Sequence, residues 1–257
     1  MQNPQNILIT GASSGIGRAL AIAYSKADVN LFLCARSSEN LQQTKTLCEN
    51  LKAKVYIKIL DVCDQLASKK WLDEIEQEFA LDLVIANAGI SAGTAQGTES
   101  FAQVQEIFNT NLNGVLNIIH PAIDKMLTRK NGQIAVISSL AGFRGLPSSP
   151  AYSASKSAVR VYCEGLRGNL QKFGIKVNAV CPGYVRSNMT AVNNFYMPFL
   201  MDANKACDII IKGLSKNKSR IAFPFPLYFI IWLLTLISTK ITDPLFAILP
   251  SKSAMKK

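Results

Sequence analysis

The chain has 257 residues, of which 49% are hydrophobic, and it carries a formal net charge of +11 at pH 7. This composition excludes an intrinsically disordered protein and supplies enough apolar residues for a full core. The six cysteines are scattered without the spacing of metal ligands, so the sequence predicts neither disulfides nor a metal site. The N-terminal residues lack the basic and apolar regions of a cleaved signal peptide, and we therefore expect a cytoplasmic protein.

Runs rich in Val, Ile and Leu alternate with helical patterns, which is typical of a parallel sheet covered on both faces. We predict strands near residues 6–10, 29–35, 55–60, 82–86, 132–138, 175–181 and 220–223. We predict helices near residues 15–26, 39–52, 64–79, 101–127, 150–172 and 202–215. Right-handed crossovers between these units predict an α/β fold, a Rossmann-type doubly wound sheet with helices on both faces. Ligands bind such a sheet beyond the carboxyl ends of its strands.

A glycine-rich turn, TGASSGIG at residues 10–17, follows the first predicted strand and opens the first predicted helix. Glycines let the backbone approach a pyrophosphate, and the helix N-terminus offers free N–H groups and the positive end of its dipole. The alternative is an ordinary tight turn. We expect this turn to bind a dinucleotide through Gly11, Ser13, Ser14, Gly15, Ile16 and Gly17.

The second predicted strand ends in the sequence LCARS at residues 33–37. A protein that prefers NAD is expected to carry an acidic residue about here, which bonds the ribose 2′-hydroxyl. This chain has none, and Arg36, helped by Ser13, could meet a 2′-phosphate instead. Arg36 could also be an ordinary surface charge. We predict a preference for NADP(H).

A tyrosine and a lysine, Tyr152 and Lys156, are separated by one helical turn in the sequence YSASK. Residues at positions i and i+4 share one helix face, so the phenol and the ammonium are expected to point the same way. A free tyrosine has a pKa of about 10 and is a poor base at pH 7. We expect the nearby ammonium to lower the pKa of Tyr152, although burial of the tyrosinate opposes this effect.

These motifs together resemble the short-chain dehydrogenase/reductase family, in its short branch with the TGxxxGxG and YxxxK motifs, and the resemblance covers about residues 5–223. It implies that Tyr152 is the general acid/base and that Lys156 tunes it and holds the nicotinamide ribose. Ser139 would hydrogen-bond the carbonyl oxygen as that oxygen gains charge. Asn111 matches a fourth position of the family, which bends a helix and anchors a water for proton relay.

Three further segments match cofactor-binding positions of the family. The sequence DV at residues 61–62 resembles a pair that contacts adenine. The sequence ANAG at residues 86–89 resembles NNAG with its first Asn replaced, and PGYVRS at residues 182–187 resembles PGxxxT with Ser in place of Thr. The resemblance therefore implies that NADP(H) also contacts Asp61, Val62, Asn87, Ala88, Gly89, Pro182, Gly183, Val185 and Ser187, besides Tyr152 and Lys156.

The C-terminal segment is apolar and basic. Residues 221–239 contain no charge, but Pro224 and Pro226 leave only 13 residues, 227–239, for a helix. At about 1.5 Å per residue this helix is too short for a hydrocarbon core of about 30 Å. Residues 205–257 also contain nine Lys or Arg and two Asp. We predict a catalytic domain at residues 1–223 and an extension at 224–257 that contacts either a membrane surface or another subunit.

We expect an NADP(H)-dependent oxidoreductase that interconverts a ketone and a secondary alcohol. Residues 194–201 are aromatic and Met-rich where the family places its substrate lid, which favours an apolar or lipid-like small-molecule substrate; an ordinary packed helix is the alternative. A catalytically silent NADP(H)-binding sensor or scaffold is the alternative function. The family's habit implies a homodimer or homotetramer. Nucleic-acid binding is not expected, because the basic tail lacks interleaved aromatic residues.

Overall fold

The computed structural model describes residues 3–95, 97–247, 252 and 254. Seven strands form one sheet in the order β3-β2-β1-β4-β5-β6-β7, and every neighbouring pair is parallel. This confirms the predicted Rossmann-type sheet. The strands are β1 (Asn6–Thr10), β2 (Asn30–Ala35), β3 (Lys54–Ile59), β4 (Leu83–Ala86), β5 (Gly132–Ile137), β6 (Ile175–Pro182) and β7 (Arg220–Phe223).

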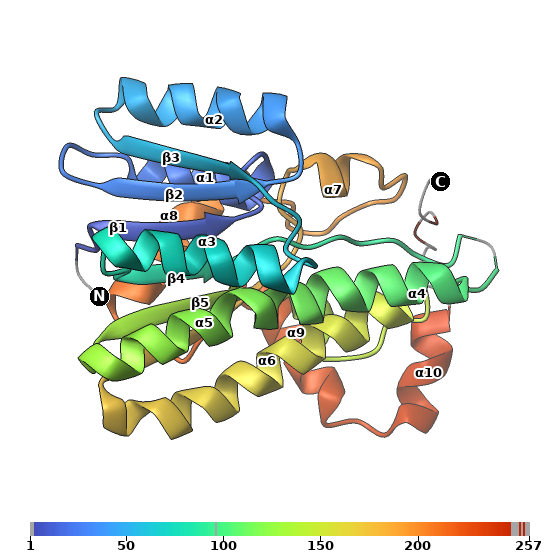
Figure 1. Cartoon of the computed structure of the whole chain (residues 1–257). Coiled ribbons are helices and arrows are strands. Elements are labelled where there is room, and N and C mark those ends of the chain that lie inside the picture. The colour runs from blue at the N-terminus through green and yellow to red at the C-terminus, as the bar shows by residue number, and fades with distance from the viewer. Residues whose placement is uncertain (1–2, 96, 248–251, 253, 255–257) are drawn as a thin grey trace.

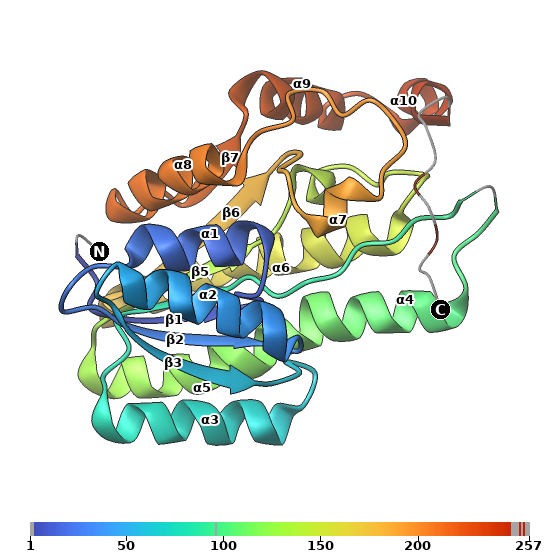
Figure 2. The same ribbon diagram turned by 90° about the horizontal axis from the view of Figure 1, so that it is seen from above.

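Helices cover both faces of this sheet (Figures 1 and 2). One face packs against α1 (Gly15–Tyr24), α2 (Ser38–Asn50) and α8 (Ala203–Ser215). The other face packs against α3 (Gln65–Glu78), α5 (Gly114–Arg129) and α6 (Pro150–Leu170). The remaining helices are α4 (Phe101–Phe108), α7 (Asn188–Ala191), α9 (Phe225–Thr235) and α10 (Thr239–Ala247), with 3₁₀ turns at Leu140–Gly142 and Gln171–Phe173.

The predicted single helix at residues 101–127 is interrupted. It consists of α4, a π-helical turn at Asn109–Asn113 and α5. The predicted helix at residues 227–239 is also wrong in its bounds, because α9 ends at Thr235 and α10 begins at Thr239. Within the described part of the chain, no helix combines the length and the hydropathy that crossing a bilayer requires.

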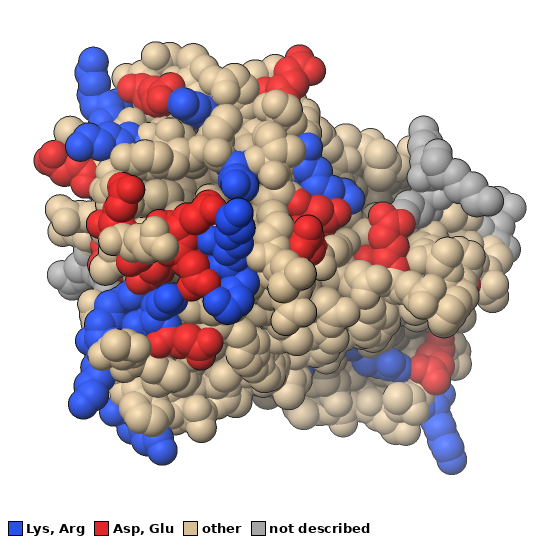
Figure 3. Space-filling view, viewed as in Figure 1, with Lys and Arg blue, Asp and Glu red and all other residues tan. Residues whose placement is uncertain are grey.

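Charged side chains gather on one part of the surface. Figure 3 shows them over α3 and α5, whereas fewer lie over the right side of the same view. Lys125 and Arg129 of α5 pair there with Asp73 and Glu76 of α3, at 2.9 and 2.7 Å. These contacts join two helices on the same face of the sheet. They lie apart from the carboxyl ends of the strands, where the predicted site residues meet.

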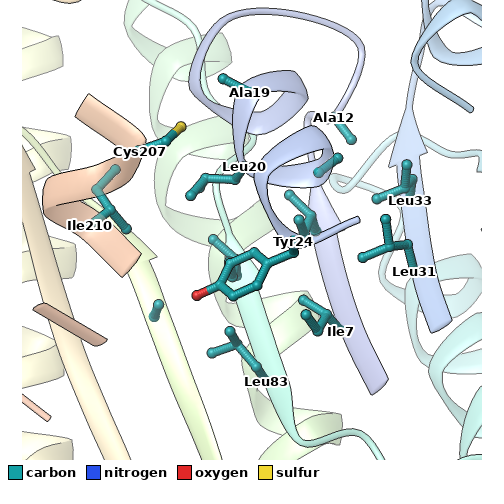
Figure 4. Close-up of a cluster of buried hydrophobic side chains, with 14 of the residues drawn as sticks. Ile7, Ala12, Ala19, Leu20, Tyr24, Leu31, Leu33, Leu83, Cys207 and Ile210 are labelled. Carbon is teal, nitrogen blue, oxygen red and sulfur yellow. The ribbon is translucent and has the colours of Figure 1, made fainter. Parts of the chain in front are cut away.

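Successive strand residues enter opposite halves of the core, as the two-residue period of a strand requires. Ile7 and Ile9 of β1 face the α1 side, and Leu8 faces the α3 side; all three are fully buried. Figure 4 shows Tyr24 of α1 beside Ile7 and Leu83. Burial raises the pKa of this phenol above its ordinary value. Tyr24 is therefore a protonated core residue.

Candidate active site

A cavity of about 740 Å³ lies at the carboxyl ends of the strands. The structure brings almost all predicted site residues into its wall, and only Gly17 and Asn111 lie behind it. The predicted residues that line it are Gly11, Ser13, Ser14, Gly15, Ile16, Arg36, Asp61, Val62, Asn87, Ala88, Gly89, Ser139, Tyr152, Lys156, Pro182, Gly183, Val185 and Ser187.

The glycine-rich turn between β1 and α1 depends on its glycines. Gly11 and Gly15 have φ values of +63° and +53°, in the left-handed region that favours glycine. A Cβ on Gly17 would lie 2.3 Å from the carbonyl oxygen of Gly11, so α1 can pack this closely only without a side chain there. The Asn87 amide donates to the carbonyl oxygens of Thr10 and Gly11 at 2.8 and 3.2 Å. Asn87 thereby fixes the turn to the end of β4.

The N-terminus of α1 can accept an anionic ligand. Its N-cap residue, Ser14, makes no side-chain capping hydrogen bond, and no acidic residue occupies the first turn. The first N–H groups of a helix have no partner within the helix, and the helix dipole is positive at this end. Because this terminus lines the cavity, it fits the pyrophosphate of a dinucleotide.

A cation and an acid occupy the wall of the cavity near the ends of β2 and β3. Arg36 follows β2, is exposed, and takes part in no ion pair among the described residues. Asp61 follows β3 and accepts a hydrogen bond from the N–H of Cys63 at 2.9 Å. The side chain of Val62 packs against Gly114, where a Cβ would approach it to 2.5 Å. The end of β2 carries no acidic side chain.

The phenol of Tyr152 and the hydroxyl of Ser139 meet at the opposite part of the wall. Tyr152 is in the first turn of α6, which begins at Pro150, and Ser139 follows β5. The Ser139 hydroxyl accepts a hydrogen bond from the Ala141 N–H at 3.1 Å. A hydrogen bond from Ser139 favours the ionised form of Tyr152. A carbonyl oxygen bound between these two hydroxyls could receive hydrogen bonds from both.

The pKa of Tyr152 differs from the sequence-based expectation. Burial raises this pKa above its ordinary value, and the hydrogen bond from Ser139 opposes the rise only in part. The net direction is therefore opposite to the lowering that we expected, because the cost of burying a tyrosinate outweighs the other effects, and Lys156 is not among the causes of the shift. Tyr152 is protonated near neutral pH, which is the state of a proton donor.

Lys156 lies beneath the ring of Tyr152. Its ammonium is 5.9 Å from the ring centre and donates to the carbonyl oxygen of Ile137 at 2.8 Å. Burial lowers the pKa of Lys156 to about 8. A Cβ on Gly89 would lie 3.2 Å from this ammonium, so Gly89 leaves the room that Lys156 needs beside the cavity.

Asn111 supports the site from behind the wall. It lies in the π-helical turn and is fully buried. Its amide pairs with the backbone of Ile90, accepting from the N–H at 2.8 Å and donating to the carbonyl oxygen at 2.9 Å. It also donates to the hydroxyl of Ser155 at 3.0 Å. Asn111 therefore joins three segments, namely the π-turn, the loop after β4 and α6.

The segment after β6 passes over the cavity. Gly15 lies against Ser187 of this segment, since a Cβ on Gly15 would be 3.0 Å from that of Ser187. The short helix α7 follows, and residues 192–202 form no further helix. Phe195, Tyr196 and Pro198 line the cavity from this stretch. The alternative of an ordinary packed helix at residues 194–201 is therefore wrong.

Two parts of the wall were not predicted. Apolar side chains of α9 line the cavity, whereas the sequence pattern indicated only that this segment must bury its apolar surface. Lys252 also reaches the cavity from the C-terminal end of the chain. Because α9 is apolar on all sides, its sequence could not indicate which face points inward, and no local signal placed Lys252. The inward-facing α9 residues are Leu227, Ile230, Ile231 and Leu234.

Comparison with known proteins agrees with this geometry. A family model described as short chain dehydrogenase matches residues 5–195. An uncharacterized oxidoreductase of Myxococcus xanthus is 37% identical over 221 residues, which cover 86% of this chain and 87% of the relative. The ketoacyl reductase HetN of Nostoc sp. is 30% identical over 220 residues, which cover 84% of this chain and 76% of the relative.

The fold is likewise shared with solved structures. The apo form of LigD from Sphingobium sp. strain SYK-6 superposes with a TM-score of 0.81 at 26% identity, and the match covers 97% of this chain and 99% of that structure. The region that the family model matches, residues 5–195, includes the glycine-rich turn, Asn111, Ser139, Tyr152 and Lys156. The chain therefore belongs to the short-chain dehydrogenase/reductase family of oxidoreductases.

Proposed function

We propose that this protein is an NADP(H)-dependent oxidoreductase that interconverts a ketone and a secondary alcohol. The observation that carries the proposal is the phenol of Tyr152, which lies with Ser139 and Lys156 in the wall of one cavity. The free N-terminus of α1 and its glycine turn fit a dinucleotide in the same cavity. When bound, NADP(H) supplies or accepts the hydride.

The side chains of the site handle the proton and the developing charge. In the reductive direction Tyr152 donates its proton to the substrate oxygen, and Ser139 donates a hydrogen bond to the same oxygen. With its raised pKa, Tyr152 is protonated at neutral pH and so carries the proton that reduction requires. Lys156 holds the nicotinamide ribose, and Asn111 keeps the loop at Ile90 and α6 in position.

The choice of NADP(H) over NAD(H) rests on the end of β2. Solved structures with this fold include one with bound NADP and another bound to NAD. Here the position after β2 carries Arg36 and no acidic residue, and Ser13 lines the cavity with it. A guanidinium recognises a phosphate by charge-assisted hydrogen bonds, whereas it offers nothing specific to a ribose hydroxyl. We therefore assign Arg36 and Ser13 the role of binding the 2′-phosphate of NADP(H).

An apolar ketone fits the other part of the cavity. Its wall there is formed by α9, by Phe246 of α10 and by the segment with Phe195. The segment 194–201 is assigned the role of a lid over this substrate. The name of the Nostoc relative, a ketoacyl reductase, agrees with carbonyl reduction. A panel of apolar ketones incubated with NADPH should yield secondary alcohols. If no ketone of the panel is converted to its alcohol, the proposed function is contradicted.

The extension at residues 224–257 is assigned to a membrane surface, beside a catalytic domain at residues 1–223. The outward side of α9 exposes Phe225, Phe229 and Trp232, whose rings form a continuous series. Lys240 is exposed on α10, next along the chain, and can meet anionic headgroups. Because α9 also lines the cavity, an apolar ketone could pass from the membrane to the site.

We further propose that the catalytic domain assembles as a homodimer or a homotetramer.

Sedimentation with anionic phospholipid vesicles tests the membrane contact. The double variant Phe225→Asp, Phe229→Asp should lower the vesicle partition coefficient at least about 10-fold, because each buried aromatic side chain contributes about 1.5–3 kcal/mol. Leu66→Asp is the matched control, since Leu66 is an apolar residue of α3 that is 81% exposed. Unchanged vesicle binding with a smaller oligomer in light scattering would show that α9 contacts a subunit instead.

A further inference from the structure

The C-terminal end of the chain returns to the cavity at Lys252. The backbone oxygen of Lys252 accepts a hydrogen bond from the N–H of Ala95 at 2.7 Å. A Cβ on Gly93 would lie 2.5 Å from the Cβ of Lys252, so the two backbones pack directly together. This contact joins the end of the chain to the loop that follows β4. These contacts place Lys252 in the wall of the cavity.

The ammonium of Lys252 lies beside the reaction centre. It donates to the hydroxyl of Ser91 at 2.7 Å and is 5.7 Å from the centre of the Tyr152 ring. Ser91 follows Gly89, the last residue of the predicted cofactor motif in this loop. Lys252 and Ser91 both line the cavity. A substrate whose carbonyl oxygen meets Tyr152 would therefore have Lys252 among its neighbours.

No acidic side chain neutralises this ammonium. Lys252 takes part in none of the ion pairs among the described residues. Residues 244–257 contain no Asp or Glu in the sequence. Burial lowers the pKa of Lys252 to about 8. An unpaired, partly desolvated cation is costly in a folded protein, and a bound anion would compensate that cost.

Arg144, a further cation at this end of the cavity, is already engaged. Arg144 pairs with Asp243 at 2.6 Å and donates to the hydroxyl of Thr242 at 3.1 Å. Its guanidinium also stacks on the ring of Phe246 at 5.2 Å. These contacts fasten α10 to the loop after β5. Lys252 thus differs from Arg144, because its charge is left for a ligand.

We propose that Lys252 is a specificity residue that binds an anionic group, a carboxylate or a phosphate, on an apolar ketone substrate. The inference rests on the proposed ketone reduction and names its substrate class. The apolar body of such a substrate would lie against α9 and Phe246, and its anion would meet Lys252 beside Ser91. Lys252 contacts the substrate and takes no part in the transfer of hydride or proton.

Calorimetric binding of unreactive ligands tests the site without turnover. The full-length protein should bind octanoate, and Lys252→Met should raise the octanoate Kd about 10- to 100-fold, the range of a charge-assisted hydrogen bond. Lys252→Arg should retain the affinity for octanoate. The Kd of octanol should differ by no more than about twofold between the unsubstituted protein and Lys252→Met. The control Lys216→Met removes an exposed lysine after α8 and should change neither Kd. The Kd of octyl phosphate is compared with that of octanoate. The ligand with the lower Kd shows whether the site prefers a phosphate or a carboxylate.

Three results of the binding measurement would count against the inference. The first is an octanoate Kd that Lys252→Met leaves unchanged. The second is an equal loss of octanoate and octanol affinity, which would show that the substitution damages the cavity wall. Failure of Lys252→Arg to restore binding lost in Lys252→Met would also count against a charge-based site.

Kinetics separates this inference from the proposed function. An apolar oxo acid and its methyl ester are compared with NADPH. Lys252→Met should raise KM for the acid about 10- to 100-fold and leave kcat, and both constants for the ester, within about twofold. Reduction of the ester without preference for the acid would contradict only the role of Lys252. Reduction of neither compound, with octanoate binding that depends on Lys252, would contradict only the reductase function.

Discussion

Tyr152→Phe is expected to lower kcat/KM for ketone reduction about 10²- to 10⁴-fold, the range that a positioned general acid contributes. The substitution removes one hydroxyl and keeps the ring, which contacts the ammonium groups of Lys156 and Lys252. The wall of the cavity should therefore stay intact. Binding of NADPH, followed by its fluorescence, should remain within about twofold of the unsubstituted protein.

Tyr162→Phe is the matched control for this experiment. Tyr162 lies on the same helix, α6, and its hydroxyl bonds the His120 ring nitrogen at 2.7 Å, outside the cavity. Its removal should leave turnover nearly unchanged. If Tyr152→Phe retains turnover, Tyr152 has no part in the mechanism. If it loses NADPH binding as well, its role is structural and the assignment of a general acid is wrong.

Arg36→Ala is expected to raise KM for NADPH about 10- to 100-fold, because a charge-assisted hydrogen bond to the 2′-phosphate is lost. Arg36 has no ion pair among the described residues, so the substitution breaks no internal salt bridge. KM for NADH should stay within about twofold. Initial rates with each cofactor at a fixed ketone concentration measure both constants.

A lysine on another helix controls for the loss of positive charge. Lys70 of α3 is exposed, and Lys70→Ala should change neither KM. Comparable kcat/KM values with NADPH and NADH in the unsubstituted protein would refute the cofactor preference. If Arg36→Ala raises KM for NADPH and KM for NADH by the same factor, Arg36 instead binds a part of the dinucleotide that both cofactors share.

The centre of the sheet was predictable because its strands are buried on both faces. All residues of β4 and β5 are buried, and apart from Gln133 they form apolar runs that differ clearly from the polar positions of the helices. The π-turn was not evident from periodicity. It coincides with Asn111, whose side chain bonds the backbone of Ile90, and such a long-range bond leaves no local pattern. Only the family resemblance indicated a bend at this residue.

The arrangement of the site was less predictable than its members. Motif spacing identified Tyr152 and Lys156, but the raised pKa of Tyr152 depends on burial by segments far along the chain. By contrast, the ends of β1 and β4 meet at Asn87, as the motif predicts. Lys252 lies 161 residues from Ser91, its hydrogen-bond partner. No motif or period connects two such positions, so only the folded chain brings this cation to the cavity.

The most direct test of ketone reduction follows the hydride itself. The protein is incubated with an apolar ketone and with NADPH that carries deuterium at both positions of nicotinamide C4, and the product is analysed by mass spectrometry. Transfer to the carbonyl carbon predicts a secondary alcohol with deuterium on its carbinol carbon. An alcohol without deuterium, or consumption of NADPH without any alcohol, would contradict the proposed reaction.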